Sequence, residues 1–173
     1  MYLTGFGPFG QVEVNPSSRN LDGSIEGVDV RRDIEVTTDG VDLTLKQIPL
    51  DSVVIHFGVN AKGSKFQVEK CAYNAKSWAE GEKIEEKGPN MVSTDIDVHR
   101  LVGVLESEFP VEISTDPGRY VCNYMYYRSL RIDSRKRLFV HVPPYEAVAR
   151  EEQLGFIKRL VEVVRVYWGA GLY

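Results

Sequence analysis

The chain has 173 residues, of which 43% are hydrophobic and 27% are charged, and its formal net charge is −4. This length and apolar content fit one domain, residues 1–173, with its own core, while the acidic balance argues against nucleic acid or an anionic membrane as a partner. No apolar run approaches the ~20 residues that cross a bilayer, and the N-terminus, MYLTGFGPFG, lacks the pattern of a signal peptide.

The first half of the chain alternates short apolar strands with helices. Asn15-Pro16 is typical of a helix start, with Asn15 as the N-cap and Pro16 in the first helical position. The apolar, β-branched run over residues 52–57 ends at Gly58 and predicts a strand buried on both faces. The other elements expected here are strands over residues 2–4, 28–36 and 65–72 and a helix over residues 41–48.

The second half continues this alternation after a polar loop over residues 74–89. Strands followed by helices predict βαβ units, and therefore a mostly parallel sheet between helical layers. Ligands in such folds bind beyond the carboxyl ends of the strands. The elements expected here are helices over residues 95–108, 121–130 and 151–168, strands over 111–114 and 137–142, and a turn over 115–118.

The segment Gly5-Phe-Gly-Pro-Phe-Gly10 matches the dinucleotide-binding pattern G-x-G-x-x-G after a strand. Pro8 removes a backbone N–H that a phosphate would need, and two phenylalanines occupy positions that suit small residues. No strand ends in an acidic residue about 20 positions later. Two other interpretations stay open: a tight turn with phenylalanines in the core, or an aromatic clamp for a small flat ring.

Cys122 lies in Gly118-Arg-Tyr-Val-Cys-Asn123, at the expected start of a helix. The N-terminus of a helix favours negative charge, and hence the nucleophilic thiolate. The alternative is a cysteine that packs as a small apolar side chain. With only Cys71 beside it and no need for a disulfide, the chain is expected to be reduced and cytoplasmic.

A catalytic thiol also requires a base that accepts its proton. His141 lies near the end of a strand, on the same expected sheet edge as Cys122, whereas His56 is expected in the core and His99 in solvent. Glu69 stands in an apolar strand, where a carboxylate is costly unless paired, so we expect it to orient His141. The alternative for Glu69 is a solvent-facing position.

Together, these segments resemble the type I pyroglutamyl peptidases, also called pyrrolidone-carboxylate peptidases. The resemblance covers most of the chain, in the same order, and its last two motifs are closer to animal than to bacterial forms. The motifs are Thr4–Gly10 with Asn15–Ser17, His56–Gly58 with Val68–Asn74, Gly118–Asn123, and Phe139–Pro143.

The resemblance implies a single-domain, three-layer α/β/α sandwich with a mostly parallel mixed sheet and no metal or organic cofactor. It implies a cysteine peptidase that removes N-terminal 5-oxoproline from peptides through a thioester, as a monomer or weak homo-oligomer. Cys122 would be the nucleophile, His141 the base and acid, and Glu69 the residue that orients His141. Phe6 and Phe9 would sandwich the lactam ring, and the other residues that would line the pocket are Asn15, Val59, Tyr120 and Val121.

The chain departs from the family in being trimmed near residues 20–28 and after Asn74. Many relatives carry an arginine in the second region that assists the oxyanion hole, but here the segment reads Ala75-Lys-Ser-Trp-Ala-Glu80. Lys76 would be a point charge in place of a planar fork. The alternative function is therefore a weakened relative that binds blocked N-termini without efficient turnover.

Overall fold

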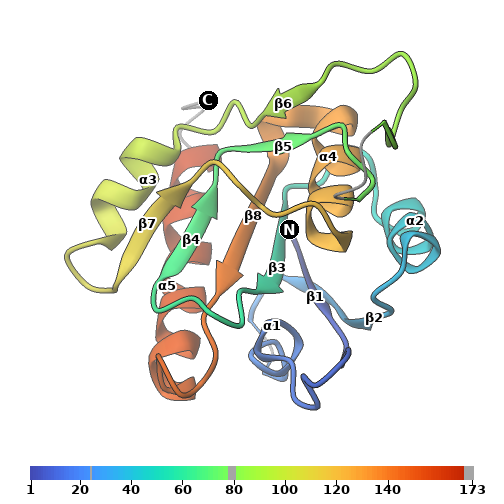
Figure 1. The fold of residues 1–173 in the computed structure, drawn as a ribbon. Helices are drawn as coiled ribbons and strands as arrows, with labels where there is room; N and C mark the ends of the chain where they lie inside the picture. Colours follow the sequence, from blue (N-terminus) through green and yellow to red (C-terminus); the bar gives the residue numbers. More distant parts are fainter. Residues whose placement is uncertain (24, 78–80, 170–173) are drawn as a thin grey trace.

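The computed structural model describes residues 1–23, 25–77 and 81–169. Within these ranges, six strands form one sheet in the order β2-β1-β3-β8-β4-β7, and β5 pairs with β6 in a second, smaller sheet (Figure 1). The strands are β1 (Tyr2–Phe6), β2 (Asp29–Ile34), β3 (Val54–Val59), β4 (Phe66–Glu69), β5 (Cys71–Tyr73), β6 (Met91–Ser93), β7 (Val111–Ser114) and β8 (Arg137–Val142).

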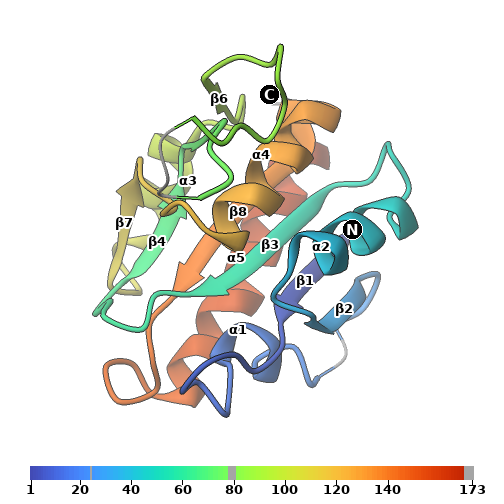
Figure 2. The same ribbon diagram turned by 45° about the vertical axis from the view of Figure 1, so that its right-hand side comes forward.

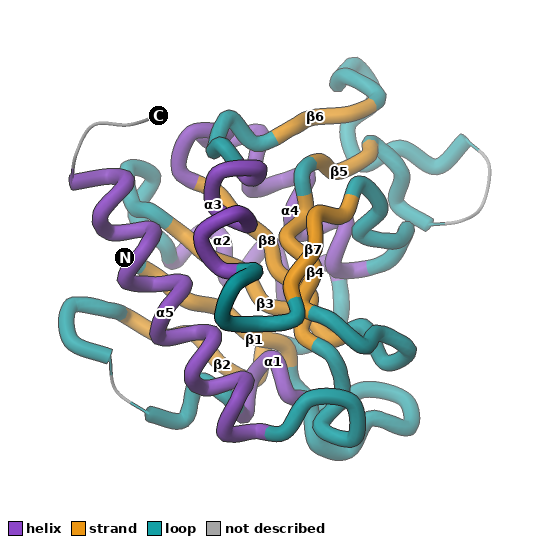
Figure 3. The backbone as a smooth tube through the Cα atoms, turned by 90° about the vertical axis from the view of Figure 1, so that its left-hand side faces the viewer, coloured by secondary structure: helices purple, strands orange, loops and turns teal. Residues whose placement is uncertain are grey.

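Helices cover both faces of the large sheet (Figure 2). The short α1 packs against the strands on the same face as α3 and α5, which contact each other, and α5 runs along that face (Figure 3). On the opposite face, α2 and α4 contact each other. No helix in the described part of the chain is long and apolar enough to cross a membrane. The helices are α1 (Pro16–Arg19), α2 (Thr38–Gln47), α3 (Val98–Leu105), α4 (Val121–Asp133) and α5 (Arg150–Gly169), with a 3₁₀ turn over Ser134–Lys136.

The strands are parallel at every junction of the large sheet except one. β4 runs antiparallel to β8, with Gln67 opposite His141 and Glu69 opposite Phe139, and β7 runs parallel to β4. The mostly parallel mixed sheet in a three-layer α/β/α arrangement, expected from the sequence, is therefore confirmed.

Each face of the sheet carries its own apolar cluster, because side chains alternate along the strands. On β1, Leu3 packs with the α5 side and Phe6 with the α4 side. Gly5 lies against α1 so closely that an added Cβ would stand 2.1 Å from the Ser17 carbonyl oxygen. That approach requires glycine, and it brings the start of α1 next to the end of β1.

Several expected elements differ from the structure in length or number. β1 continues through Gly5 to Phe6, and β3 continues through Gly58 to Val59, because both segments pair with neighbouring strands. The expected strand over residues 65–72 is two strands: the Lys70 N–H still bonds to Ser114, but its carbonyl bonds to Thr94, and the chain leaves the large sheet there.

Other boundaries shift for local reasons. α2 begins at Thr38, earlier than the expected residue 41, because the Thr37 side chain caps the helix by accepting from the Gly40 N–H at 3.0 Å. The expected loop over 74–89 holds for its described part, with residues 78–80 outside the described ranges, and the short β6 follows it. The expected N-cap, Asn15, is confirmed, since its Oδ1 accepts from the Ser17 N–H at 3.0 Å.

Candidate active site

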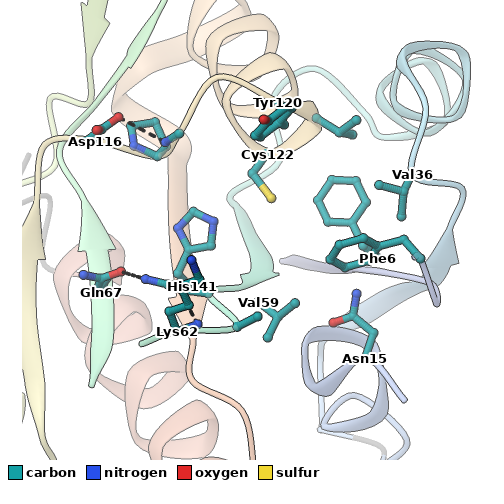
Figure 4. Close-up of a pocket in the computed structure, with 16 residues that line it drawn as sticks. Phe6, Asn15, Val36, Val59, Lys62, Gln67, Asp116, Tyr120, Cys122 and His141 are labelled. Atoms are coloured by element: carbon teal, nitrogen blue, oxygen red, sulfur yellow. Dashed lines mark hydrogen bonds between the residues drawn. The ribbon is translucent and has the colours of Figure 1, made fainter. Parts of the chain in front are cut away.

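Cys122, His141 and Glu69 are brought together from three different elements. His141 is next to last in β8, Glu69 ends β4, and Cys122 is the second residue of α4. The His141 Nδ1 lies 2.7 Å from the Glu69 Oε1, and the Cys122 sulfur points toward the His141 ring (Figure 4). Because Nδ1 faces the carboxylate, Nε2 is the nitrogen that faces the thiol.

The antiparallel register explains how Glu69 reaches His141. Gln67 stands directly opposite His141, and Glu69 is two residues further along β4 on the same face of the sheet. Such diagonal neighbours on adjacent strands lie within reach of long side chains. A glutamate at this position therefore meets the imidazole of the neighbouring strand without leaving the sheet face.

The acid and the imidazole are both buried. Glu69 is 0% exposed and His141 is 7% exposed, so the alternative of a solvent-facing Glu69 is wrong. Burial alone would lower the pKa of His141, but its hydrogen bonds to Cys122 and Glu69, together with their charges, outweigh burial and raise the pKa to about 10. The imidazole is therefore held in its charged form at neutral pH.

The two carboxylate oxygens of Glu69 differ in their hydrogen bonding. Oε1 contacts His141, while Oε2 is buried and has no hydrogen-bond partner among the described residues. The backbone carbonyl of Glu69 accepts from the Tyr126 hydroxyl at 2.8 Å. That bond fixes the end of β4 against α4, the same helix that carries Cys122.

Cys122 sits in the first turn of α4, after Tyr120 as the N-cap. The N–H groups of Val121 and Cys122 have no carbonyl one turn earlier to bond with, as at the start of any α-helix. An added Cβ on Gly58 would stand 2.8 Å from the Cys122 sulfur. The Cys122 sulfur therefore packs against the backbone of Gly58, where a larger residue would leave no room for it.

The other two histidines stand apart from this arrangement. His56 is 0% exposed, and its ring nitrogens lie 2.8 Å from the Thr4 hydroxyl and 2.7 Å from the Ser129 hydroxyl. Burial, aided by the charge of Arg137, lowers the pKa of His56 to about 3. His99 is exposed on α3. Both histidines occupy the positions expected from the sequence.

A cavity of about 700 Å³ opens beside the Cys122 sulfur and the His141 ring (Figure 4). All of the expected site residues except the buried Glu69 line it. Phe6 is buried at 3% exposure, whereas Phe9 is 40% exposed. The lining residues are Phe6, Phe9, Asn15, Val36, Val59, Asn60, Ala61, Lys62, Gln67, Asp116, Pro117, Gly118, Tyr120, Val121, Cys122 and His141.

Asn15 holds the glycine-rich turn in place while it lines the cavity. Its Nδ2 donates to the Gly7 carbonyl at 2.9 Å, and its Oδ1 accepts from both the N–H and the hydroxyl of Ser17. One amide N–H of Asn15 remains for a ligand. The turn is closed further by the pairing of Phe9 with Val12.

The same turn does not fit a dinucleotide site. The next helix begins only at Pro16, beyond the glycine pattern, so no helix N-terminus stands at Gly5–Gly10 to receive a phosphate. The two phenylalanines instead face the cavity that holds Cys122. Both interpretations left open by the sequence fit parts of this arrangement: Phe6 is buried in the core cluster beside α4, and both phenylalanines line the cavity.

Sequence reasoning missed part of the cavity wall, including Val36, Asn60, Lys62, Gln67 and Asp116. None belongs to a recognisable motif, and only the strand pairing brings Gln67 opposite His141. The role of Gly58 had a signal in the sequence, since a glycine inside an apolar strand indicates a close approach.

Asn123, beside the nucleophile, fastens α4 to the segment that follows β5. Its side chain donates to the carbonyls of Tyr73 and Ala75, both at 2.9 Å, and accepts from the Tyr73 N–H at 2.8 Å. Lys76, just beyond, is exposed and does not line the cavity, so it does not replace the family arginine there. Residues 78–80 of the same stretch lie outside the described ranges.

Comparisons with known proteins agree with this geometry. The family model for pyroglutamyl peptidases matches residues 1–158. Pyroglutamyl-peptidase 1 of Homo sapiens is 29% identical over 92% of the chain and 86% of its own length, and the pyrrolidone-carboxylate peptidase of Pyrococcus furiosus is 31% identical over 82% and 79%. The solved pyrrolidone carboxyl peptidase of Thermococcus litoralis superposes with a TM-score of 0.82, at 25% identity, over 98% of this chain and 94% of that one.

Proposed function

The chain belongs to the pyroglutamyl peptidase family, and from that membership we propose that it hydrolyses the peptide bond after an N-terminal 5-oxoproline, with Cys122 as the nucleophile. The observation that carries this assignment is the position of the His141 ring between two partners. Nδ1 meets the buried Glu69 carboxylate at 2.7 Å, and the Cys122 sulfur points toward the ring (Figure 4). A cysteine peptidase needs this arrangement of nucleophile, base and orienting acid.

The raised pKa of His141 shows that the surroundings of the ring favour a bound proton. Nε2 faces the Cys122 sulfur, so the ring is positioned to hold the thiol proton while the sulfur acts as the nucleophile (Figure 4). The buried carboxylate of Glu69 balances the imidazolium charge. Proton transfer from Cys122 to His141 therefore needs no further base.

The thiolate attacks the carbonyl carbon that follows the lactam ring, and a carbon–sulfur bond forms as the carbonyl oxygen becomes an oxyanion. The N–H groups in the first turn of α4, at Val121 and Cys122, have no partner within the helix and would donate to that oxygen. Donors of this kind, fixed before the reaction, stabilise the developing charge. The exposed Lys76 side chain does not line the cavity, so it supplies no further donor.

Collapse of the tetrahedral intermediate breaks the carbon–nitrogen bond. The His141 Nε2 gives its proton to the departing amine, which leaves as the shortened peptide. Water then attacks the thioester, its proton passes to His141, and release of 5-oxoproline restores the thiolate and the imidazolium. Glu69 stays charged throughout and keeps the ring in one orientation.

The ring is proposed to bind on the aromatic side of the cavity, against Phe6 and Phe9, with Asn15, Val59, Tyr120 and Val121 around it. 5-Oxoproline is a neutral lactam without a terminal ammonium group. Apolar and aromatic walls with few polar groups suit a small flat ligand of this kind. The remaining amide N–H of Asn15 can donate to the lactam carbonyl.

From the composition and the family we also propose the domain organisation, the compartment and the partners of the protein. Residues 1–173 form one peptidase domain that acts in the cytoplasm, as a monomer or weak homo-oligomer, on pyroglutamyl peptides and without binding nucleic acid. The free thiols of Cys71 and Cys122 suit a reducing compartment. In the described part of the chain, no group of three His, Cys, Asp or Glu side chains could hold a metal ion.

The alternative of a relative that binds blocked N-termini without turnover has no support in the comparisons, and the complete Cys122–His141–Glu69 arrangement argues for turnover. Both are tested with a pyroglutamyl-coupled fluorescent dye. We expect steady release of dye that iodoacetamide abolishes. Tight binding of a pyroglutamyl peptide with no product after long incubation would instead favour the binding protein.

A further inference from the structure

The cavity beside Cys122 has two unlike sides. In Figure 4, Phe6, Val36 and Asn15 face it from one side, and Gln67 and Asp116 face it from the other, with Lys62 below His141. Cys122 and His141 lie between these groups. At about 700 Å³, the cavity has room for more than a single five-membered ring.

The chemistry assigns a direction to the bound peptide, and this step rests on the proposed function. His141 must protonate the departing amine, so the chain beyond the scissile bond leaves on the His141 side of the sulfur. The lactam ring then occupies the aromatic side. The residue after the ring therefore meets the polar side, where Gln67 stands directly opposite His141.

Lys62 supplies the excess charge on this polar side. Asp116 is neutralised by Arg119 at 2.5 Å, and its Oδ1 also accepts from the Gly118 N–H. No carboxylate of the described residues lies within 4.0 Å of the Lys62 ammonium group, which is exposed to solvent. A substrate carboxylate that reaches this side thus meets a positive charge without a competing partner.

The backbone of Lys62 is held in a fixed relation to the catalytic residues. Its N–H donates to the Asn60 Oδ1 at 3.1 Å, and the Asn60 Nδ2 donates to the Gln67 Oε1 at 2.9 Å. Gln67 in turn donates to Glu112 at 3.0 Å. This chain of hydrogen bonds connects the lysine to β4 and so to the strand that faces His141.

We propose that Lys62 makes this enzyme prefer substrates with a carboxylate just after the lactam ring. That carboxylate has two sources: the side chain of an acidic residue in that position, or the free C-terminus of a pyroglutamyl dipeptide. Both present the same anion to the ammonium group of Lys62.

The test compares kcat/KM for three substrates at low salt: pyroglutamyl-glutamyl amide, pyroglutamyl-glutaminyl amide, and pyroglutamyl-glutamine with a free C-terminus. An exposed ion pair predicts that each anionic substrate exceeds the neutral amide by about two- to fivefold. The preference should shrink at 1 M salt, where the screening length falls to about 3 Å. If only one anionic substrate is favoured, that substrate identifies the source of the carboxylate.

Lys62→Gln should remove the preference and Lys62→Glu should invert it. Lys65→Gln is the matched control, because Lys65 is also exposed but pairs with Glu112 at 3.6 Å and does not line the cavity. Equal kcat/KM for the three substrates, or an acidic preference that survives Lys62→Glu, would overturn the proposal. The neutral dye substrate separates the two questions, since failure to cleave it would refute the peptidase itself.

Discussion

Replacing Glu69 by glutamine tests the charge of the buried acid while keeping its shape. The pKa of His141 is raised from 6.5 to about 10, which at 1.36 kcal/mol per pH unit amounts to roughly 5 kcal/mol in favour of the charged ring. Hydrogen bonds and charges from Cys122 and Glu69 share this effect against the opposing cost of burial. Glutamine can still accept a hydrogen bond from Nδ1, but it brings no negative charge.

The expected result is a loss of up to about 10⁴ in kcat/KM, the size of the drop in turnover when a neutral amide replaces the acid of a triad. The upper limb of the pH–activity profile should also move to lower pH, because the imidazolium loses its counter-charge. Stability should fall by about 1–3 kcal/mol as well. The glutamine NH₂ would take the place of Oε2, which is buried without a partner among the described residues.

The assay is hydrolysis of the pyroglutamyl dye from pH 5 to 11, with thermal unfolding measured on the same samples. Glu108→Gln is the control, because Glu108 also pairs with a basic side chain, Arg159 at 2.9 Å, but it is exposed and does not line the cavity. A Glu69→Gln protein with an unmoved pH profile and kcat/KM within twofold of the parent would refute the assigned role of the carboxylate.

Three further outcomes are expected. Cys122→Ser should reduce dye hydrolysis to background. Cys71→Ala removes a thiol that is only 3% exposed, so this variant should hydrolyse the dye and still be inactivated by iodoacetamide. Mass spectrometry of the alkylated parent protein that located the alkyl group on Cys71 would contradict this. Gly58→Ala should lower kcat at least tenfold, because its Cβ would stand 2.8 Å from the sulfur, and wild-type kinetics would show that the thiol is not held there. The free energy of unfolding should decline as the pH rises from 6.5 through about 10, because the folded protein binds the His141 proton more tightly than the unfolded chain. Urea titrations should show a smaller decline for His141→Gln. If the parent protein and His141→Gln lose the same stability over this pH range, His141 is not the cause.

Much of the fold was predictable because the local signals agree with the tertiary structure. Pro16 after an N-capping Asn15, the apolar run of β3 and the stripe on α5 each predict the element that forms. The expected site residues also proved close in space. Cys122 and His141 could be placed near each other because a helix start and a strand end are the positions where α/β folds expose reactive groups.

The direction of β4 was not predictable, and it determines the rest of the site. Glu69 was expected near the middle of a strand over residues 65–72, but it ends β4, at the point where the backbone leaves the large sheet. β7 is parallel to β4 and therefore also runs antiparallel to β8. The carboxyl end of β7 thus lies at the edge of the sheet opposite to the carboxyl end of β8, and residues 115–120 connect it to Cys122. Strand direction depends on long-range pairing, which residue types alone do not encode.

Lys62 and Gln67 escaped prediction for the same reason. Each is an ordinary polar residue in its local sequence, and each acquires a position relative to His141 only through the pairing of β4 with β8. The sequence motifs identify the catalytic residues, whereas the other residues that line the cavity depend on the register in which β4 pairs with β8.

The lone antiparallel junction in the described part of the large sheet has a consequence for how the enzyme matures. Glu69 and His141 are 72 positions apart and meet only when β4 docks on β8. Loop closure over such a separation is slow compared with local helix formation, so catalytic competence should appear among the last events of refolding. Recovery of turnover during refolding would then report that β4 has paired with β8. Neither half of the chain alone would be active.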